Sequence, residues 1–179
     1  MHGVSLAYIE NGVPQLGEIA LPALGERYQM TDGTPTCNGQ QISVSGTSTL
    51  REAVVSVGDF ATGEGSQSKN RTRLATISAL ADNVQRVRML GSAATDLAWL
   101  AAGRLDAVVM HSNKVWDVAA GIVLARAAGA TITALDGSPY EVAGADFVAS
   151  TPRVRGSVIE LLLMLGRDTS AKGLLPDVQ

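Results

Sequence analysis

The chain is poor in cysteine and has no excess of basic charge. Cys37 is the single cysteine among 179 residues, so there is no internal disulfide and no pair of thiols for a zinc site. Lysine and arginine number 14 against 17 aspartate and glutamate residues, and the formal charge of −3 argues against nucleic acid as a main partner. These scarcities predict a protein of the reducing cytoplasm.

We expect neither a membrane span nor a signal peptide, and the sequence lacks the common nucleotide-binding and esterase motifs. No uncharged apolar run reaches the roughly 20 residues that a span requires, and Glu10 follows only a few apolar residues at the N-terminus. The glycines form neither G-x-G-x-x-G nor G-x-x-x-x-G-K-[ST], and no serine lies in G-x-S-x-G. His2 and His111, the only histidines, share no metal-ligand spacing and are expected on the surface or in loops. We expect no membrane partner.

The first part of the chain, up to about Ser45, alternates short apolar runs with turns. Asn11-Gly12 and Asn38-Gly39 are dipeptides suited to the positive φ angles of tight hairpin turns. This pattern predicts an antiparallel meander. Its candidate strands are residues 4–9, 16–21, 27–30 and 41–44.

Beyond Thr47, β-like runs alternate with helical patterns, which predicts a layered α/β arrangement with a mixed sheet. The expected strands are residues 53–57, 87–90, 106–110, 130–135 and 147–149. The expected helices are residues 68–84, 93–102, 118–128 and 153–165. The first of these helices is amphipathic and is expected to bury Leu74, Ile77, Leu80, Ala81 and Val84.

Two helix starts carry candidate chemistry. Residues 118–128 are apolar except for Arg126, so most faces of that helix are expected to be buried. Asp117, at its first turn, lies beside unpaired backbone N–H groups and the positive end of the helix dipole, where it either caps the helix or holds a cation. These arguments alone favour the cap. Ser92 reads as the N-cap of the helix from Ala93, whose amides offer an alternative site for an anion.

The motifs at these helices resemble those of a known family. They are GSAATDL at 91–97, AGRLD at 102–106, WDVAAG at 116–121 and AAGA at 127–130. Together with the first strands they are similar to the C-terminal two thirds of the inositol monophosphatase family, over about residues 3–165. The resemblance implies a layered mixed-sheet α/β fold with residues 1–46 as strands of a first lobe. It further implies a complete second lobe at 47–165 and a tail at 166–179.

This family consists of Mg²⁺-dependent, lithium-sensitive phosphatases of small phosphate monoesters, which include inositol phosphates, histidinol phosphate, fructose bisphosphate and phosphoadenosine phosphates. The resemblance implies that Asp117 ligates the second catalytic Mg²⁺ and that Gly91, Ser92 and Ala93 line the hydroxyl face of the substrate. Two such ions suit an in-line displacement, because they activate a water and stabilise the leaving oxygen. A homodimer and a small phosphorylated metabolite as partner are also implied.

Two departures from the family pattern qualify this expectation. Family members carry an N-terminal portion with a glutamate and a D-P-[IL]-D-G-[TS] motif, which supply most metal ligands, and this chain contains no D-P-x-D-G. We therefore expect a chain truncated relative to the family, inactive alone for lack of ligands and with bare apolar surface on its first strands. The second departure is Met110, where a substrate-gripping glutamate is common. Loss of that charged hydrogen-bond acceptor removes about 1.5–3 kcal/mol of binding free energy, which disfavours myo-inositol monophosphate as the substrate.

Three function classes follow from these observations. They are a metal-dependent phosphomonoesterase that lacks its N-terminal third, a non-catalytic remnant that keeps the second-lobe fold, and a generic α/β domain in which Asp117 is only a cap. The motifs disfavour the third class.

Overall fold

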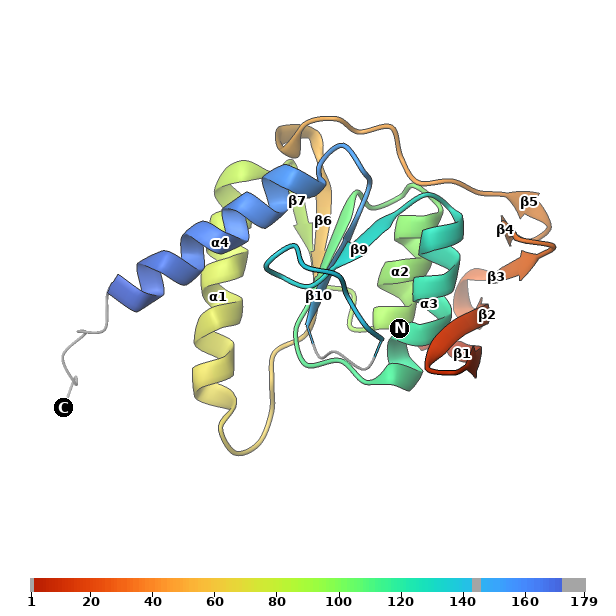
Figure 1. Cartoon of the computed structure of the whole chain (residues 1–179), viewed down its shortest axis with the longest axis horizontal. Helices are drawn as coiled ribbons and strands as arrows, with labels where there is room; N and C mark the ends of the chain where they lie inside the picture. The colour runs from red at the N-terminus through yellow and green to blue at the C-terminus, as the bar shows by residue number, and fades with distance from the viewer. Residues whose placement is uncertain (1, 143–145, 172–179) are drawn as a thin grey trace.

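A computed structural model describes residues 2–142 and 146–171, with Thr31 and residues 166–171 described by their backbone alone. The chain folds into four layers (Figure 1). An antiparallel sheet packs on helices α2 (Ala93–Ala101) and α3 (Val115–Ala127), which pack in turn on a mixed sheet. Helices α1 (Ser66–Asn83) and α4 (Arg155–Ala171) cover the far side of the mixed sheet.

The antiparallel sheet is the predicted meander, with its strands side by side in chain order. They are β1 (Val4–Glu10), β2 (Val13–Leu21), β3 (Glu26–Thr31), β4 (Thr34–Cys37) and β5 (Gln40–Gln41). Asn11 and Gly12 take φ angles of 52° and 78°, as the turn prediction requires. The strand expected at 41–44 is wrong beyond Gln41, because the chain leaves the sheet there and the Val44 N–H donates to Ala128 O after α3.

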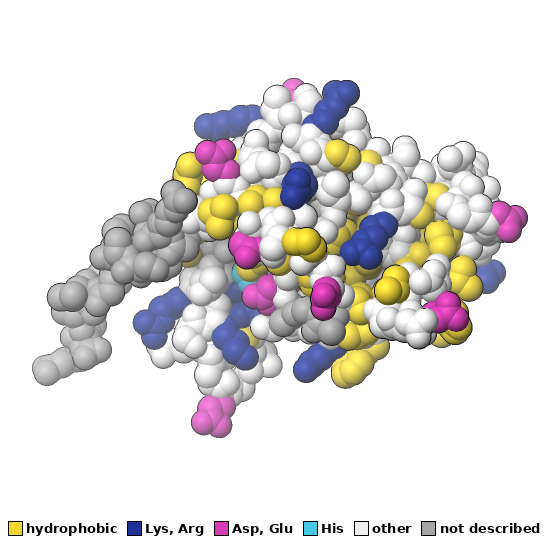
Figure 2. Space-filling model, viewed as in Figure 1, with side chains coloured by type: hydrophobic (Ala, Val, Ile, Leu, Met, Phe, Trp, Pro, Cys, Tyr) yellow, Lys and Arg dark blue, Asp and Glu magenta, His cyan; other side chains and the backbone are white. Residues whose placement is uncertain are grey.

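The two faces of the meander differ. Its inner face buries Ile19, Leu21 and Tyr28 in one cluster with residues of α2 and α3. A Cβ on Gly17 would lie 2.5 Å from Ala120 O, so β2 and α3 approach closely. The outer face exposes Leu6 to 70%, and other apolar side chains of β1 and β2 are exposed beside it, as predicted (Figure 2).

The mixed sheet has the order β7-β6-β8-β10-β9. Strands β7 (Arg86–Arg88), β6 (Val54–Val57) and β8 (Ala107–Met110) are parallel, whereas β10 (Phe147–Ser150) is antiparallel to β8 and to β9 (Thr131–Thr133). This confirms the mixed α/β prediction. Short 3-10 helices at Pro22–Leu24 and Leu50–Glu52 connect strands.

Two helix predictions need correction. In α1 the buried residues are Arg73, Thr76 and Leu80, whereas Leu74 is 56% exposed and Ala81 is exposed. A helix is present as predicted, but the face that it turns to the interior includes the charged residue Arg73. A pattern of apolar residues does not identify such a residue as buried. Helix α4 continues to Ala171, past the expected end at Leu165, and residues 172–179 of the expected tail lie outside the described residues.

The division of the chain into two lobes at residue 46 stays a prediction. Residues on both sides of it share one hydrophobic cluster. None of the helices in the described part of the chain combines the length and apolar character of a membrane span.

Candidate functional site

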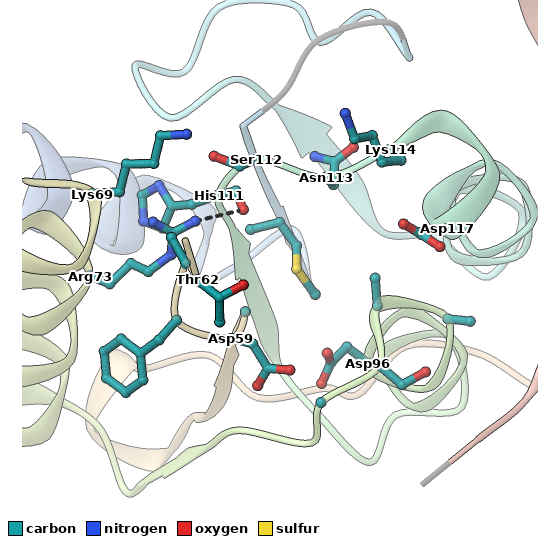
Figure 3. A pocket seen from close by; sticks show the side chains of 18 of the residues that line it. Asp59, Thr62, Lys69, Arg73, Asp96, His111, Ser112, Asn113, Lys114 and Asp117 are labelled. Atoms are coloured by element: carbon teal, nitrogen blue, oxygen red, sulfur yellow. Dashed lines mark hydrogen bonds between the residues drawn. The ribbon is translucent and has the colours of Figure 1, made fainter. Parts of the chain in front are cut away.

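A cavity of about 710 Å³ lies where the parallel strands end (Figure 3). Strands β6, β7 and β8 point the same way, so the segments that follow them meet at one edge of the sheet, which is where open α/β sheets bind ligands. Residues 58–62 follow β6, residues 91–92 follow β7, and residues 111–114 follow β8. The N-termini of α2 and α3 both reach this cavity. Its volume is typical of small-molecule sites.

All five residues singled out in the sequence line this cavity. Gly91, Ser92 and Ala93 lie at the start of α2, Met110 ends β8, and Asp117 lies in the first turn of α3. The structure thus brings together residues that are far apart in the chain.

Asp117 is not a helix cap. Helix α3 begins at Val115, three residues before the apolar run, and its N-cap residue is Lys114, whose side chain makes no capping bond. The Asp117 N–H donates to Lys114 O at 2.9 Å, which is an ordinary first-turn contact. Its carboxylate is exposed, makes no hydrogen bond to any described residue and points toward the cavity (Figure 3).

Ser92 is the N-cap of α2, as predicted. Its Oγ accepts a hydrogen bond from Thr95 N at 3.3 Å, which satisfies one of the free amides of the first turn. The preceding Gly91 has a φ of 73°, and a Cβ there would lie 3.4 Å from Asp59 Oδ2. The start of α2 therefore lies against the loop that follows β6.

Asp96 is a buried acid in the wall of the cavity that sequence reasoning missed. It is only 1% exposed, and its Oδ1 accepts a hydrogen bond from Ser56 Oγ of β6 at 2.5 Å. Burial raises the pKa of the Asp96 carboxyl to about 7, the nearby Asp59 carboxylate adds to the rise, and the Ser56 hydrogen bond opposes it. The signal available in the sequence was one acid inside the apolar helix 93–101.

Besides Lys114, two cationic side chains occupy another wall of the cavity. Lys69 and Arg73 reach the cavity from α1, and the Arg73 Nη2 donates to His111 O at 3.2 Å. His111 lies in a loop, as predicted, and its side chain is only 10% exposed. Its Nδ1 lies 3.7 Å from Asp146 Oδ2, and the proximity of the imidazole lowers the pKa of Asp146.

The described residues do not assemble a metal centre by themselves. Among residues 2–142 and 146–171, no three His, Cys, Asp or Glu side chains gather closely enough to hold an ion. Asp59, Asp96 and Asp117 line one cavity without forming such a group. Because Mg²⁺ requires a near-octahedral set of oxygens, these residues do not fit a complete magnesium site.

Comparison with known proteins gives one consistent result. The model of the inositol monophosphatase family matches residues 1–164. A probable inositol 1-monophosphatase ImpA of Mycobacterium tuberculosis is 34% identical over 91% of this chain, and a fructose-1,6-bisphosphatase/inositol-1-monophosphatase of Thermotoga maritima is 32% identical over 89%. The chain covers only 61% and 59% of those two proteins.

Solved structures agree with this likeness. The inositol monophosphatase of Anabaena aligns over 90% of this chain and 64% of its own, with a TM-score of 0.83 and 33% identity. The Thermotoga maritima IMPase aligns over 92% of this chain and 61% of its own, with a TM-score of 0.81 and 30% identity. The fold prediction is confirmed.

Proposed function

The chain belongs to the inositol monophosphatase family, and from this premise we propose that its cavity takes part in the Mg²⁺-dependent hydrolysis of a small phosphate monoester. Inositol phosphates and histidinol phosphate belong to the class of substrates that the proposal covers. Asp117 would serve as one metal ligand, and the first turn of α2, at Gly91, Ser92 and Ala93, would contact the substrate.

The observation that carries the proposal is the state of the Asp117 carboxylate. It is exposed, faces the cavity and has no hydrogen-bonding role among the described residues. A carboxylate kept free at a cavity edge is suited to binding a hard cation, because Mg²⁺ prefers oxygen ligands. The neighbouring helix N-termini offer amides to a phosphate.

The same observations limit the activity of this chain. One carboxylate does not complete the coordination sphere of Mg²⁺. The described residues contain no cluster of three or more metal-binding side chains that could supply the other ligands. We therefore propose that the 179-residue chain is inactive alone, and that the activity requires carboxylates from outside it.

Met110 bears on the choice of substrate. Its side chain is 4% exposed and ends β8 inside the cavity wall. A thioether is a weak acceptor and cannot replace a carboxylate as a partner for a sugar hydroxyl. The proposal therefore favours substrates other than myo-inositol monophosphate.

The metal role of Asp117 can be tested by titrating Mn²⁺ into the protein and following paramagnetic broadening by NMR. We expect weak binding that broadens the amide signals of Asp117 and Val118, and that Asp117→Asn abolishes. Asp82→Asn, at an exposed acid outside the cavity, serves as the matched control and should change nothing. Equal broadening in Asp117→Asn, or a steep fall in its melting temperature with unchanged metal binding, would contradict the ligand assignment.

Activity provides a second test. We expect no Mg²⁺-dependent hydrolysis of a general phosphomonoester by the 179-residue protein, and no tight Mg²⁺ binding by calorimetry. Robust turnover that disappears both with EDTA and in Asp117→Asn would overturn the proposal that the ligand set is incomplete.

A non-catalytic remnant is the second candidate, and the lack of a metal cluster among the described residues favours it. The DNA preceding Met1 separates the two. An in-frame D-P-x-D-G-[TS] segment there would support the enzyme, and its absence would support the remnant.

We also propose a cytoplasmic homodimer. The single cysteine, Cys37, is free and suits a reducing compartment. Strand β1 forms an edge of its sheet with exposed apolar side chains, and such edges favour association. Size-exclusion chromatography with light scattering tests the dimer.

A further inference from the structure

One peptide group beside the cavity is held at both ends by opposite charges. It joins His111 to Ser112, directly after β8. Its carbonyl oxygen, His111 O, accepts a hydrogen bond from Arg73 Nη2 at 3.2 Å, and its N–H, on Ser112, donates to Asp146 Oδ1 at 2.7 Å. The peptide dipole therefore lies between a cation on α1 and a carboxylate just before β10, and each charge faces the end of the dipole that it attracts.

The two charged side chains act on each other across this peptide. Arg73 is 5% exposed, so its hydrogen bond to His111 O is shielded from water. Asp146 Oδ2 also lies 3.7 Å from His111 Nδ1. The imidazole, the Ser112 N–H and the Arg73 charge all hold the pKa of the Asp146 carboxyl below its usual value, while partial burial opposes them. The carboxylate is therefore charged at neutral pH.

Ser112 has a backbone conformation that a serine rarely adopts. Its φ is 59°, in the left-handed region, which lowers the population of a non-glycine residue by about tenfold. The other described non-glycine residues with a positive φ are Asn11, Asp32 and Asn38, and each precedes a glycine in a hairpin turn. Asparagine and aspartate tolerate this region better than serine does. Strain of this kind persists only where the surrounding structure enforces it.

Turning the peptide plane over would relieve the strain. Such a turn changes ψ of His111 and φ of Ser112 together, and it brings Ser112 to a negative φ. It also carries the carbonyl oxygen away from Arg73 and the N–H away from Asp146. A hydrogen bond to a charged group shifts an equilibrium by about tenfold or more, so two of them together outweigh the penalty of the left-handed conformation.

This peptide lies at the start of the loop that leads to the proposed metal ligand. Residues 112–114 line the cavity, α3 begins at Val115, and the Asp117 N–H donates to Lys114 O at 2.9 Å. Figure 3 shows the loop running from His111 to α3, with the hydrogen bond from Arg73 dashed at its beginning. The orientation of one peptide therefore sets the path by which the chain enters the helix.

We propose that Arg73 and Asp146 clamp the peptide between His111 and Ser112, and that this clamp positions the start of α3, and with it Asp117, at the cavity. Both are positioning residues, because they act through the loop. The inference rests on the proposed function only in giving Asp117 a metal to bind. The alternative is that Asp146 adds stability without directing the loop.

The first experiment needs no metal. In EDTA, the ¹³C shifts of Ser112 report whether its backbone is left-handed or extended. Residual dipolar couplings of the N–H groups of residues 115–118 report the direction of the first turn of α3. We expect Asp146→Ala to move Ser112 to the extended region and to change those couplings. Asp146→Asn keeps an oxygen that accepts the Ser112 N–H, so it should retain the wild-type values of both.

Asp136 provides the matched control. Its Oδ1 accepts the Ser138 N–H at 2.9 Å in an exposed turn outside the cavity. Asp136→Ala should leave the Ser112 shifts and the α3 couplings unchanged. A Ser112 that stays left-handed in Asp146→Ala overturns the clamp. Equal effects of Asp146→Ala and Asp146→Asn also overturn it, because they would assign the effect to the lost charge.

A second substitution separates positioning from general stabilisation. Glycine adopts a positive φ without a steric penalty. In the double variant Asp146→Ala with Ser112→Gly, the couplings of residues 115–118 should therefore return toward the wild-type values, and couplings that stay displaced contradict control through Ser112. The Asp146 side chain is 45% exposed, so Asp146→Ala should fold. If it does not, Ser112→Val tests the same step, because a β-branched residue disfavours the left-handed region and should displace the couplings.

The last measurement locates Asp117 itself. Mn²⁺ bound there broadens amide signals steeply with distance, so the broadening at Gly91 and Ser92 relative to that at Asp117 reports the span of the cavity. We expect this ratio to change in Asp146→Ala and to match the wild type in Asp146→Asn and Asp136→Ala. An unchanged ratio contradicts the positioning and leaves the metal role intact. Absence of broadening at Asp117 in the wild type contradicts the metal proposal alone, and the metal-free couplings then decide the clamp.

Discussion

The Ser56 hydroxyl donates to the Asp96 carboxylate at 2.5 Å, which joins strand β6 to the first turn of α2 beneath the cavity. Both side chains are fully or almost fully buried. The hydrogen bond stabilises the charged form of Asp96, but burial outweighs it, and the pKa stays raised at about 7. Asp96 is therefore about half protonated at pH 7, where the same carboxyl group is almost fully ionised in the unfolded chain.

This difference in pKa predicts that the protein is less stable at pH 8 than at pH 5. Between the unfolded pKa near 4 and the folded pKa near 7, the folded state binds more protons, so the free energy of unfolding falls as pH rises. Between these two pH values Asp96 lowers the free energy of unfolding by about 2–3 kcal/mol as an upper bound. Urea unfolding at both pH values measures it, and Asp96→Asn should flatten the change. Glu52→Gln, at an exposed acid, should keep the wild-type trend, and a wild-type protein more stable at pH 8 would contradict the assignment.

Loss of the Ser92 cap should lower stability modestly. Ser92→Ala removes the acceptor for Thr95 N and should cost about 1 kcal/mol. Ser92→Asn supplies another side-chain acceptor at the N-cap and should recover most of that loss. Urea midpoints measure both variants, and equal destabilisation by Ala and Asn would mean that the hydroxyl acts otherwise than as a cap.

Helices α2 and α3 should not tolerate a methyl group between them. A Cβ on Gly121 would lie 2.5 Å from Leu97 Cβ, so Gly121→Ala should lower the free energy of unfolding by about 1–3 kcal/mol. Gly156→Ala, on a helix surface with nothing within 4 Å of the added Cβ, is the matched control. It should be neutral or stabilising by up to about 1 kcal/mol. Thermal unfolding compares the two, and similar melting temperatures would rule out the close packing.

The stability of the protein should depend on the inner face of the meander and not on its outer face. Leu21 is fully buried against α2 and α3, so Leu21→Ala should cost about 2–5 kcal/mol. Leu6 is 70% exposed, and Leu6→Ala should change stability by less than about 0.5 kcal/mol. Chemical denaturation with a probe of the whole fold measures both. A large loss in Leu6→Ala would show that the outer face is covered in solution.

Local patterns in the sequence were enough for many of these features. The turn at Asn11-Gly12, the N-cap at Ser92 and the strand and helix alternation beyond Thr47 were predicted and are present. Each depends on residues adjacent in the chain, because backbone φ preferences and side-chain capping act over one to four residues. The family motifs predicted that Gly91, Met110 and Asp117 belong to one site. All three line one cavity, and their roles in a site stay a prediction.

The tertiary structure decided which polar residues face the interior. Arg73 and Asp96 lie on the buried sides of their helices, although an apolar pattern assigns charged residues to solvent. His111 is placed by the end of β8, and its contacts to Arg73 and Asp146 link segments distant in the chain. Asp117 shows the same limit, since the local pattern around it favoured a helix cap over a metal ligand. The earlier start of α3 moves it off the cap position, and the shared direction of β6, β7 and β8 opens a cavity in front of it. Such placements depend on how strands and helices pack across the chain, and short-range patterns carry no information about that packing.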